Sequence, residues 1–332
     1  MLELNKMNGK AGHRKMSWVK LQEIIMRDPF ILTDRKQNCY FLYGTDMMTC
    51  DGAANVDPCF LCYVSEDLEN FYGPYIVFEP EKGFWGVKNY WAPEVYEYEG
   101  KYYMLASFKG GIKEDRGTAV LVADAPEGPF REHSHGHVTL PGHECLDGTL
   151  YIEEGQPWVI FCHEWTEIYY GKIKALPLEK DLSKVEDYKK ELLLVDTQTD
   201  GIPWIRQMRD DRVGKTGYLT DAPFLYKMKN GRLLLLWSSY AVNENGGKGG
   251  YVVAGCVSKS GRLEGPWEHL EHPLLDANAG HGALFLDLHK QLRLVLHTND
   301  TAHGEEHPMI LSVKENEEGL LIENMTRRIC NV

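Results

Sequence analysis

The sequence predicts an all-β chain folded as a five-bladed β-propeller with four antiparallel strands in each blade. Three observations favour this fold: a hairpin pattern that recurs five times, a Gly-Pro-aromatic segment that follows several copies, and the weakness of any helical pattern. At 332 residues, 43% of them hydrophobic, the chain can form one large β domain with a packed core. We expect a flexible tail over residues 1–17 and a single propeller over residues 18–332.

Each copy of the hairpin pattern has a polar lead residue, a short apolar run, a turn and a more apolar run. In LTDAPFLYKMKNGRLLLLWSS (219–239) the two runs flank Asn-Gly, which is typical of a tight turn between antiparallel strands. Pro223 cannot donate to a strand ladder and therefore favours a strand start. The five copies are led by Asp28, Glu94, Asp147, Asp221 and His281.

A Gly-Pro-aromatic segment follows the hairpins at residues 65–75, 123–133 and 258–270. An apolar run precedes each segment, so every unit contains two hairpin strands, a third strand and a Gly-Pro entry into a fourth. Repetition at this scale in an all-β chain indicates a propeller. The best helical stretch, residues 176–194, is interpreted as an excursion between blades 3 and 4 that carries one short helix.

Composition excludes several classes of protein. The net charge of −13 argues against nucleic acid and anionic membrane as partners. No apolar run reaches the roughly 18 residues of a membrane span, and the N-terminus has no apolar stretch of signal-peptide length, so we expect a cytoplasmic protein. Cys59 and Cys62 would face opposite sides of a strand, so we interpret them as buried thiols rather than a metal or redox pair.

The lead residues should meet, because the innermost strand of every propeller blade starts at the same rim of the central channel. Crowded carboxylates raise one another's pKa, which lets one act as a protonated acid while another is an ionised base. Two carboxylates about 6.5 to 9.5 Å apart leave room for a water and invert a sugar's anomeric carbon. Trp91 and Trp165 are candidate sugar-stacking residues, with core packing as the alternative.

Five landmarks carry a resemblance to a known family: RDPF, WAPEVYEYEGKYYMLAS, CLDGTLYIEEGQPWVIFCHEW, LTDAPFLYKMKNGRLLLLWSS and AGHGALF. Their order, across about residues 18–312, resembles the inverting five-bladed propellers of glycoside hydrolase family 43. The resemblance implies a carbohydrate substrate and an activity such as α-L-arabinofuranosidase, β-xylosidase, endo-arabinanase or exo-galactanase. We favour an exo-acting α-L-arabinofuranosidase on plant-type polysaccharide or oligosaccharide, with a β-xylosidase or galactan-active enzyme as the alternative.

The resemblance also assigns roles. Asp28 would be the general base, Asp147 the third carboxylate that tunes and orients the acid, and Asp221 the general acid. His281 matches an axial histidine that sits over a bound calcium in many members, so a structural Ca²⁺ is expected there, although the chemistry needs no cofactor. The expected substrate-binding residues are Trp91, Glu94, His163 and Trp165; many members have Asp where Glu94 leads its blade.

One residue departs from the family pattern: the usual acid is Glu, and Asp221 is one methylene shorter, or about 1.5 Å. A misplacement of about 1 Å can cost on the order of 10²-fold in rate. Three explanations stay open. Asp221 is the acid on a shifted backbone; Glu144 or Glu164 replaces it; or acid catalysis is lost, and the protein binds glycan or cleaves only activated substrates.

Other polar residues give weaker expectations. The run His133, His135, His137 and His143 fits no zinc template, and we interpret it as a solvated loop near the channel. His297 could hydrogen-bond sugar, and Trp204 or Arg206 could contact substrate from a rim wall over residues 201–218. The rival classes are a retaining fructoside-cleaving propeller, a non-catalytic carbohydrate-binding propeller and a protein-binding scaffold.

Overall fold

The computed structural model describes residues 15–50, 58–111, 115–243, 246–276, 278–298, 304–316 and 319–323. These residues form β-strands almost throughout, with one short α-helix, α1 (Trp165–Ile168), and the 3-10 turns η2 (Leu21–Glu23) and η3 (Tyr188–Lys190). No helix in these ranges is long and apolar enough to span a membrane.

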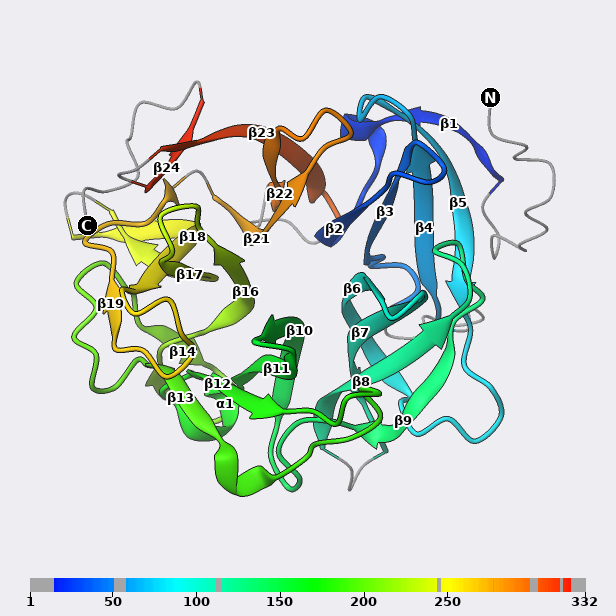
Figure 1. Cartoon of the computed structure of the whole chain (residues 1–332). Coiled ribbons are helices and arrows are strands. Elements are labelled where there is room, and N and C mark those ends of the chain that lie inside the picture. The colour runs from blue at the N-terminus through cyan, green and yellow to red at the C-terminus, as the bar shows by residue number, and fades with distance from the viewer. Residues whose placement is uncertain are drawn as a thin grey trace.

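Among the described residues, five of the six sheets are arranged as blades around a central axis (Figure 1). Blade 1 contains β2 (Arg27–Asp34), β3 (Cys39–Thr45), β4 (Phe60–Ser65) and β5 (Asn70–Phe78). Blade 2 contains β6 (Lys88–Tyr98), β7 (Lys101–Lys109), β8 (Arg116–Ala123) and β9 (Arg131–His137). Blade 3 contains β10 (Cys145–Glu153), β11 (Gln156–His163), β12 (Lys172–Pro177) and β13 (Leu192–Asp196).

Blade 4 contains β16 (Asp221–Lys227), β17 (Leu233–Val242), β18 (Lys248–Ser258) and β19 (Trp267–His269). Blade 5 contains β21 (Ala279–Leu286), β22 (Leu292–Thr298), β23 (His307–Asn316) and β24 (Gly319–Ile322). Neighbouring strands in every blade are antiparallel, and β2, β6, β10, β16 and β21 lie nearest the axis (Figure 1). The predicted five-bladed propeller is therefore confirmed.

Short strands are added outside the blades. The strand β1 (Ser17–Lys20) pairs with β5 as a fifth, outer strand of blade 1. Ser17, the last residue of the predicted tail, is therefore part of a sheet. Residues 1–14 lie outside the described residues. The strands β14 (Met208–Asp210) and β15 (Lys215–Gly217) form a hairpin between blades 3 and 4, and β20 (Leu275–Asp276) pairs with β18.

The Gly-Pro prediction is confirmed, because Gly73–Pro74 lies within β5, and Gly128–Pro129 and Gly265–Pro266 lead into β9 and β19. The predicted position of segment 176–194 is wrong. This segment lies within blade 3, where η3 and an isolated bridge between Leu178 and Val185 connect β12 to β13. Its last apolar residues pair with β12 as an outer strand, which a helical interpretation had hidden.

Buried side chains pack mainly between neighbouring blades. Between blades 1 and 2, the ring of Tyr90 lies 5.7 Å from Phe60 and 4.8 Å from Phe108, measured between ring centroids. Between blades 3 and 4, Trp204 packs on Trp237 with centroids 5.2 Å apart. Cys59 and Cys62 are buried, in keeping with the small-apolar interpretation. This packing fixes the blade angles and therefore the positions of the axial residues.

Candidate active site

Each of the five innermost strands has an irregularity at its first residues that turns two side chains toward the axis. The register with the second strand shifts there in every blade, and the second of the two residues has a left-handed backbone with φ between 48° and 56°. We call the first positions the first ring: Arg27, Trp91, Leu146, Asp221 and Gly280. We call the second positions the second ring: Asp28, Ala92, Asp147, Ala222 and His281.

The predicted equivalence of the five lead residues is therefore only partly right. Asp28, Asp147 and His281 share the second ring, whereas Asp221 lies one position earlier, in the first ring. Glu94 lies two residues after the second-ring residue Ala92. Aligning the motifs on the proline or glycine that follows the second ring, in RDPF, WAPE, LDGT, DAPF and GHGA, would have given this register from the sequence.

Hydrogen bonds between blades hold the second ring in place. A side chain on the second strand of one blade accepts from the second-ring N–H of the next: Thr45 Oγ1 from Ala92 (2.8 Å), Ser107 Oγ from Asp147 (2.8 Å), Ser238 Oγ from His281 (2.9 Å) and His297 Nδ1 from Asp28 (3.2 Å). Between blades 3 and 4 the equivalent side chain is Cys162, and Asp147 Oδ2 instead accepts from Ala222 at 3.1 Å. The Asp147 carboxylate is thus part of this hydrogen-bonded ring.

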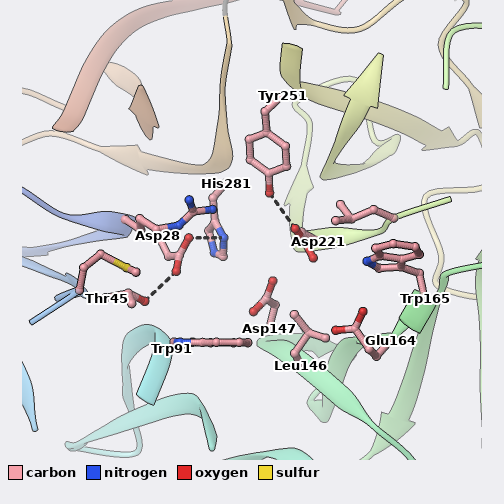
Figure 2. Close-up of a pocket in the computed structure, with 13 residues that line it drawn as sticks. Asp28, Thr45, Trp91, Leu146, Asp147, Glu164, Trp165, Asp221, Tyr251 and His281 are labelled. Atoms are coloured by element: carbon pink, nitrogen blue, oxygen red, sulfur yellow. Dashed lines mark hydrogen bonds and ion pairs between the residues drawn. The ribbon is translucent and has the colours of Figure 1, made fainter. Parts of the chain in front are cut away.

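A cavity of about 520 Å³ opens over these residues (Figure 2). It is lined by Arg27, Asp28, Thr45, Met47, Trp91, Leu146, Asp147, Glu164, Trp165, Leu219, Asp221, Tyr251 and His281. The structure thus brings together the three predicted catalytic aspartates, the predicted metal ligand His281 and two predicted stacking residues, Trp91 and Trp165. Sequence analysis missed Arg27, Thr45 and Tyr251, and only the first of these lies beside a recognised motif residue.

Asp28 is held as an ionised carboxylate. Its Oδ1 lies 3.0 Å from His281 Nδ1, and its Oδ2 accepts a hydrogen bond of 2.7 Å from Thr45 Oγ1 (Figure 2). Burial alone would raise the pKa of Asp28, but the charge and hydrogen bond of His281, with the charge of Arg27, lower it well below the usual carboxyl range. Burial lowers the pKa of His281, but Asp28, Asp147 and Glu94 together raise it to about 9.

Asp147 and Asp221 face the same cavity in a different electrostatic environment. Burial raises the pKa of Asp147 to about 6, opposed by the charge of His281. Burial, and then the charges of Asp147 and Glu164, raise the pKa of Asp221 well above the usual range, although the hydroxyl of Tyr251 donates a hydrogen bond of 3.1 Å to Asp221 Oδ2. The cavity therefore holds one carboxyl whose pKa is lowered, Asp28, and another whose pKa is raised, Asp221.

The two glutamates considered as replacement acids are both ion-paired. Glu164 lies 2.9 Å from Arg116 and also caps α1, accepting from the Thr166 amide at 3.1 Å. Glu144 pairs with Lys109. The Arg116 guanidinium also lies 4.8 Å from the centroid of the Trp91 ring, so one cation braces both Glu164 and Trp91 from behind the cavity.

Several predicted substrate contacts lie away from the cavity lining. Glu94 is buried beneath it, where the hydroxyl of Tyr96 donates to its carboxylate and burial raises its pKa to about 7. His163 is buried, with its Nε2 3.0 Å from Glu167. His297 is fully buried and accepts from the Asp28 amide, so its predicted contact with sugar is replaced by a bracing role.

The predicted rim wall and histidine loop are also corrected. Trp204 is buried against Trp237, and Arg206 lies over Tyr240 at 5.0 Å from its ring centroid, outside the cavity lining. His133, His135 and His137 lie in β9, the outer strand of blade 2, rather than in a loop. His143 meets His163 and Glu167, whose ligand atoms lie within 4.8 Å of one another. Glu167, in α1, also accepts a hydrogen bond from the Glu144 amide. These contacts connect α1 to the segment between β9 and β10 that carries His143 and Glu144.

A cavity that holds one carboxyl of lowered pKa and another of raised pKa fits the base and acid pair of a glycoside hydrolase. The family model "Glycosyl hydrolases family 43" matches residues 22–320, so the chain belongs to this family and is an inverting glycosidase with a carbohydrate substrate. No curated protein matches the chain.

Solved structures of enzymes resemble the chain over most of its length. An endo-arabinase from Bacteroides thetaiotaomicron is 35% identical, with a TM-score of 0.79, over 90% of this chain and 98% of that one. An endo-1,4-β-xylanase from the same organism is 22% identical, with a TM-score of 0.68, over 91% and 95%. An α-L-arabinofuranosidase from Lactobacillus brevis is 16% identical, with a TM-score of 0.68, over 91% and 96%. The last two share the fold only.

Proposed function

We propose that this glycosidase hydrolyses α-L-arabinofuranosyl linkages and releases arabinose from arabinan-type polysaccharide or oligosaccharide. The observation that carries the mechanism is the contrast between Asp28, ion-paired with His281, and Asp221, buried beside two like charges. The 35% identity to a protein named endo-arabinase supports an arabinose-containing substrate and favours cleavage within a chain as the second candidate.

In the proposed reaction, Asp28 takes a proton from a water that attacks the anomeric carbon. The bond from that carbon to the glycosidic oxygen breaks as Asp221 gives its proton to the departing oxygen. Asp147 stays close to Asp221, raises its pKa and is itself held by the Ala222 amide. Trp91 and Trp165 border the cavity as stacking surfaces for the sugar (Figure 2).

Asp221 is a better acid than either glutamate that could replace it. A general acid must hold a proton at the working pH, and an ion pair with a cation opposes this. Glu164 pairs with Arg116, and Glu144 pairs with Lys109, whereas Asp221 faces Asp147 and Glu164 without a cation in hydrogen-bond contact among the described residues. We therefore assign the acid to Asp221 despite its short side chain.

The axial residues fit a calcium site poorly. Calcium takes about 6 to 8 oxygen ligands. His281 instead directs its Nδ1 to Asp28 at 3.0 Å, and the oxygens of Asp28 and Glu94 are engaged by Thr45 and Tyr96. We propose that the imidazolium of His281 supplies the positive charge on the axis, and no step of the proposed reaction uses a metal.

The test is hydrolysis of linear and branched arabino-oligosaccharides and of xylo-oligosaccharides by the wild type, Asp28→Asn and Asp221→Asn. We expect arabinose release by the wild type and a loss of at least about 10³-fold in both variants on natural linkages. Aryl arabinosides, whose leaving groups need little acid assistance, should retain much more activity in Asp221→Asn than in Asp28→Asn. Dialysis against EDTA should leave the rates unchanged.

Each other outcome contradicts a named part of the proposal. If Asp221→Asn keeps wild-type activity on oligosaccharides, another residue is the acid, and Glu164→Gln is the next variant. Longer oligosaccharide products without free arabinose would favour cleavage within the chain. A wild type that binds arabinan but turns over none of the panel would indicate a carbohydrate-binding protein. A loss of rate after EDTA would support the expectation of a bound metal ion near His281.

A further inference from the structure

The first ring of the cavity lacks one side chain. Blades 1 to 4 contribute Arg27, Trp91, Leu146 and Asp221, and all four line the cavity. Blade 5 contributes Gly280, and a Cβ there would overlap the ring of Tyr251. The missing side chain is thus replaced by a phenol that reaches in from β18, the third strand of the neighbouring blade 4.

The Tyr251 ring is held on more than one side. It lies over Gly280 and stacks on His297, with ring centroids 5.6 Å apart and an interplanar angle of 16°. Both Tyr251 and His297 are at most 2% exposed. The hydroxyl is therefore carried to the cavity on a rigid support, where it lies 3.1 Å from Asp221 Oδ2 (Figure 2).

The hydrogen bond from Tyr251 bears on the short side chain of Asp221, whose carboxyl is withdrawn by about 1.5 Å relative to that of a glutamate. A hydrogen bond to one carboxyl oxygen restricts rotation of a short side chain. Because the hydroxyl donates to Oδ2, the acidic proton of Asp221 resides on Oδ1, the oxygen left to meet the glycosidic oxygen. A longer side chain at this position would meet the Tyr251 hydroxyl.

We propose that Tyr251 is a positioning residue for this reaction: seated in the gap left by Gly280, it fixes the carboxyl of Asp221 so that an aspartate serves as the acid. This inference rests on the proposed function of Asp221. Tyr251 acts through Asp221 and transfers no proton itself. The pair Tyr251 and Asp221 should behave as a unit, with Gly280 as the permissive residue.

The first experiment compares Tyr251→Phe with the wild type, because phenylalanine keeps the ring that packs on His297 and removes only the hydroxyl. On arabino-oligosaccharides we expect kcat to fall by about 10- to 100-fold with little change in KM. On aryl arabinosides the fall should be less than about threefold. Tyr226→Phe is the matched control, since Tyr226 lies in the same blade as Tyr251 and its hydroxyl donates to Glu315 of blade 5, away from the cavity lining. This variant should leave all rates unchanged.

The pH profile separates positioning from loosened packing. The Tyr251 hydroxyl lowers the pKa of Asp221, so its removal should move the alkaline limb of the kcat/KM profile to higher pH. A variant damaged only in packing would lose rate on both substrate types without that shift. Equal losses on both substrate types, or an unmoved alkaline limb, would overturn the proposal.

A substrate-free measurement keeps this inference apart from the proposed function. NMR titration of the aspartate side-chain carboxyls, with Asp221→Asn to assign the resonance, should give a higher pKa for Asp221 in Tyr251→Phe than in the wild type. An unchanged value would overturn the pairing even if arabinan is the substrate. A shifted value in a protein that cleaves none of the arabinosides would retain the pairing and reject the substrate.

Discussion

At the scale of single residues, two aspartates that would have the same pKa in solution have different pKa values at the propeller axis. Asp28 lies against the imidazolium of His281, which favours the ionised form. Asp221 lies against Asp147 and Glu164, whose charges favour the protonated form. Their surroundings thus shift the pKa values of two aspartates in opposite directions, which suits one to act as a base and the other as an acid.

The alkaline limb of activity should move when Asp147 loses its charge. The charge of Asp147 raises the pKa of Asp221, so Asp221 keeps its proton to higher pH and loses it as pH rises through the raised value. Asp147→Asn should lower that pKa and move the alkaline limb of kcat/KM on arabino-oligosaccharides to lower pH. Asp124→Asn, which changes an exposed carboxylate, is the control, and an alkaline limb unchanged in both variants would contradict this account.

At the scale of elements, the irregular start of each innermost strand is what delivers the chemistry. Five non-glycine residues adopt a left-handed backbone there, a conformation that costs on the order of 1 kcal/mol each. Side chains of Thr45, Ser107, Ser238 and His297 offset this cost by accepting hydrogen bonds from buried amides. The second strands of blades 1, 2, 4 and 5 thus position the second-ring residue of the next blade.

Ser107→Ala should therefore affect both stability and catalysis. It leaves the amide of Asp147 buried without its acceptor, so the free energy of unfolding should fall by about 1–3 kcal/mol, measured by urea denaturation. The rate on arabino-oligosaccharides should fall as well. Asp147 accepts a hydrogen bond from the amide of Ala222, the residue after Asp221, so a displaced Asp147 also disturbs the position of the acid. Ser17→Ala, at an exposed position of β1, should change neither, and an equal stability of Ser107→Ala and wild type would exclude the bracing role.

At the scale of the whole molecule, the ring closes through contacts between blades 5 and 1 rather than through a shared strand among the described residues. The amide of Met26 donates to the Glu306 carbonyl at 2.8 Å, and His307 Nδ1 lies 2.9 Å from the Ile24 carbonyl. Arg27, a first-ring residue, pairs with the buried carboxylate of Glu306 at 2.9 Å. Arg27 therefore both lines the cavity and joins blade 1 to blade 5.

Glu306→Gln should weaken this closure. We expect the free energy of unfolding to fall by about 1–3 kcal/mol at neutral pH, since a buried partner of Arg27 loses its charge. Burial would raise the pKa of Glu306, but backbone hydrogen bonds and the hydrogen bond and charge of Arg27 lower it. The contribution of Glu306 to the free energy of unfolding is therefore present above the usual Glu range and is lost as pH falls through the lowered pKa. Glu97→Gln, which breaks the exposed pair with Lys36, should change stability by less than about 0.5 kcal/mol; equal losses in the two variants would contradict the closure argument.

The sequence by itself determined the propeller and the residues that reach its axis. Apolar runs, Asn-Gly turns and Gly-Pro segments are properties of neighbouring residues, so they predict strands and hairpins without knowledge of the rest of the chain. The fivefold recurrence of the hairpin pattern then brings Asp28, Asp147, Asp221 and His281 together, because a closed ring of blades directs every innermost strand to one centre.

Only the tertiary structure decided how those residues are used. The burial of Glu94, the pairing of Glu164 with Arg116 and the seating of Tyr251 over Gly280 join residues from different strands and blades. Such contacts depend on distances between blades, which packing sets to fractions of an ångström and no local pattern encodes.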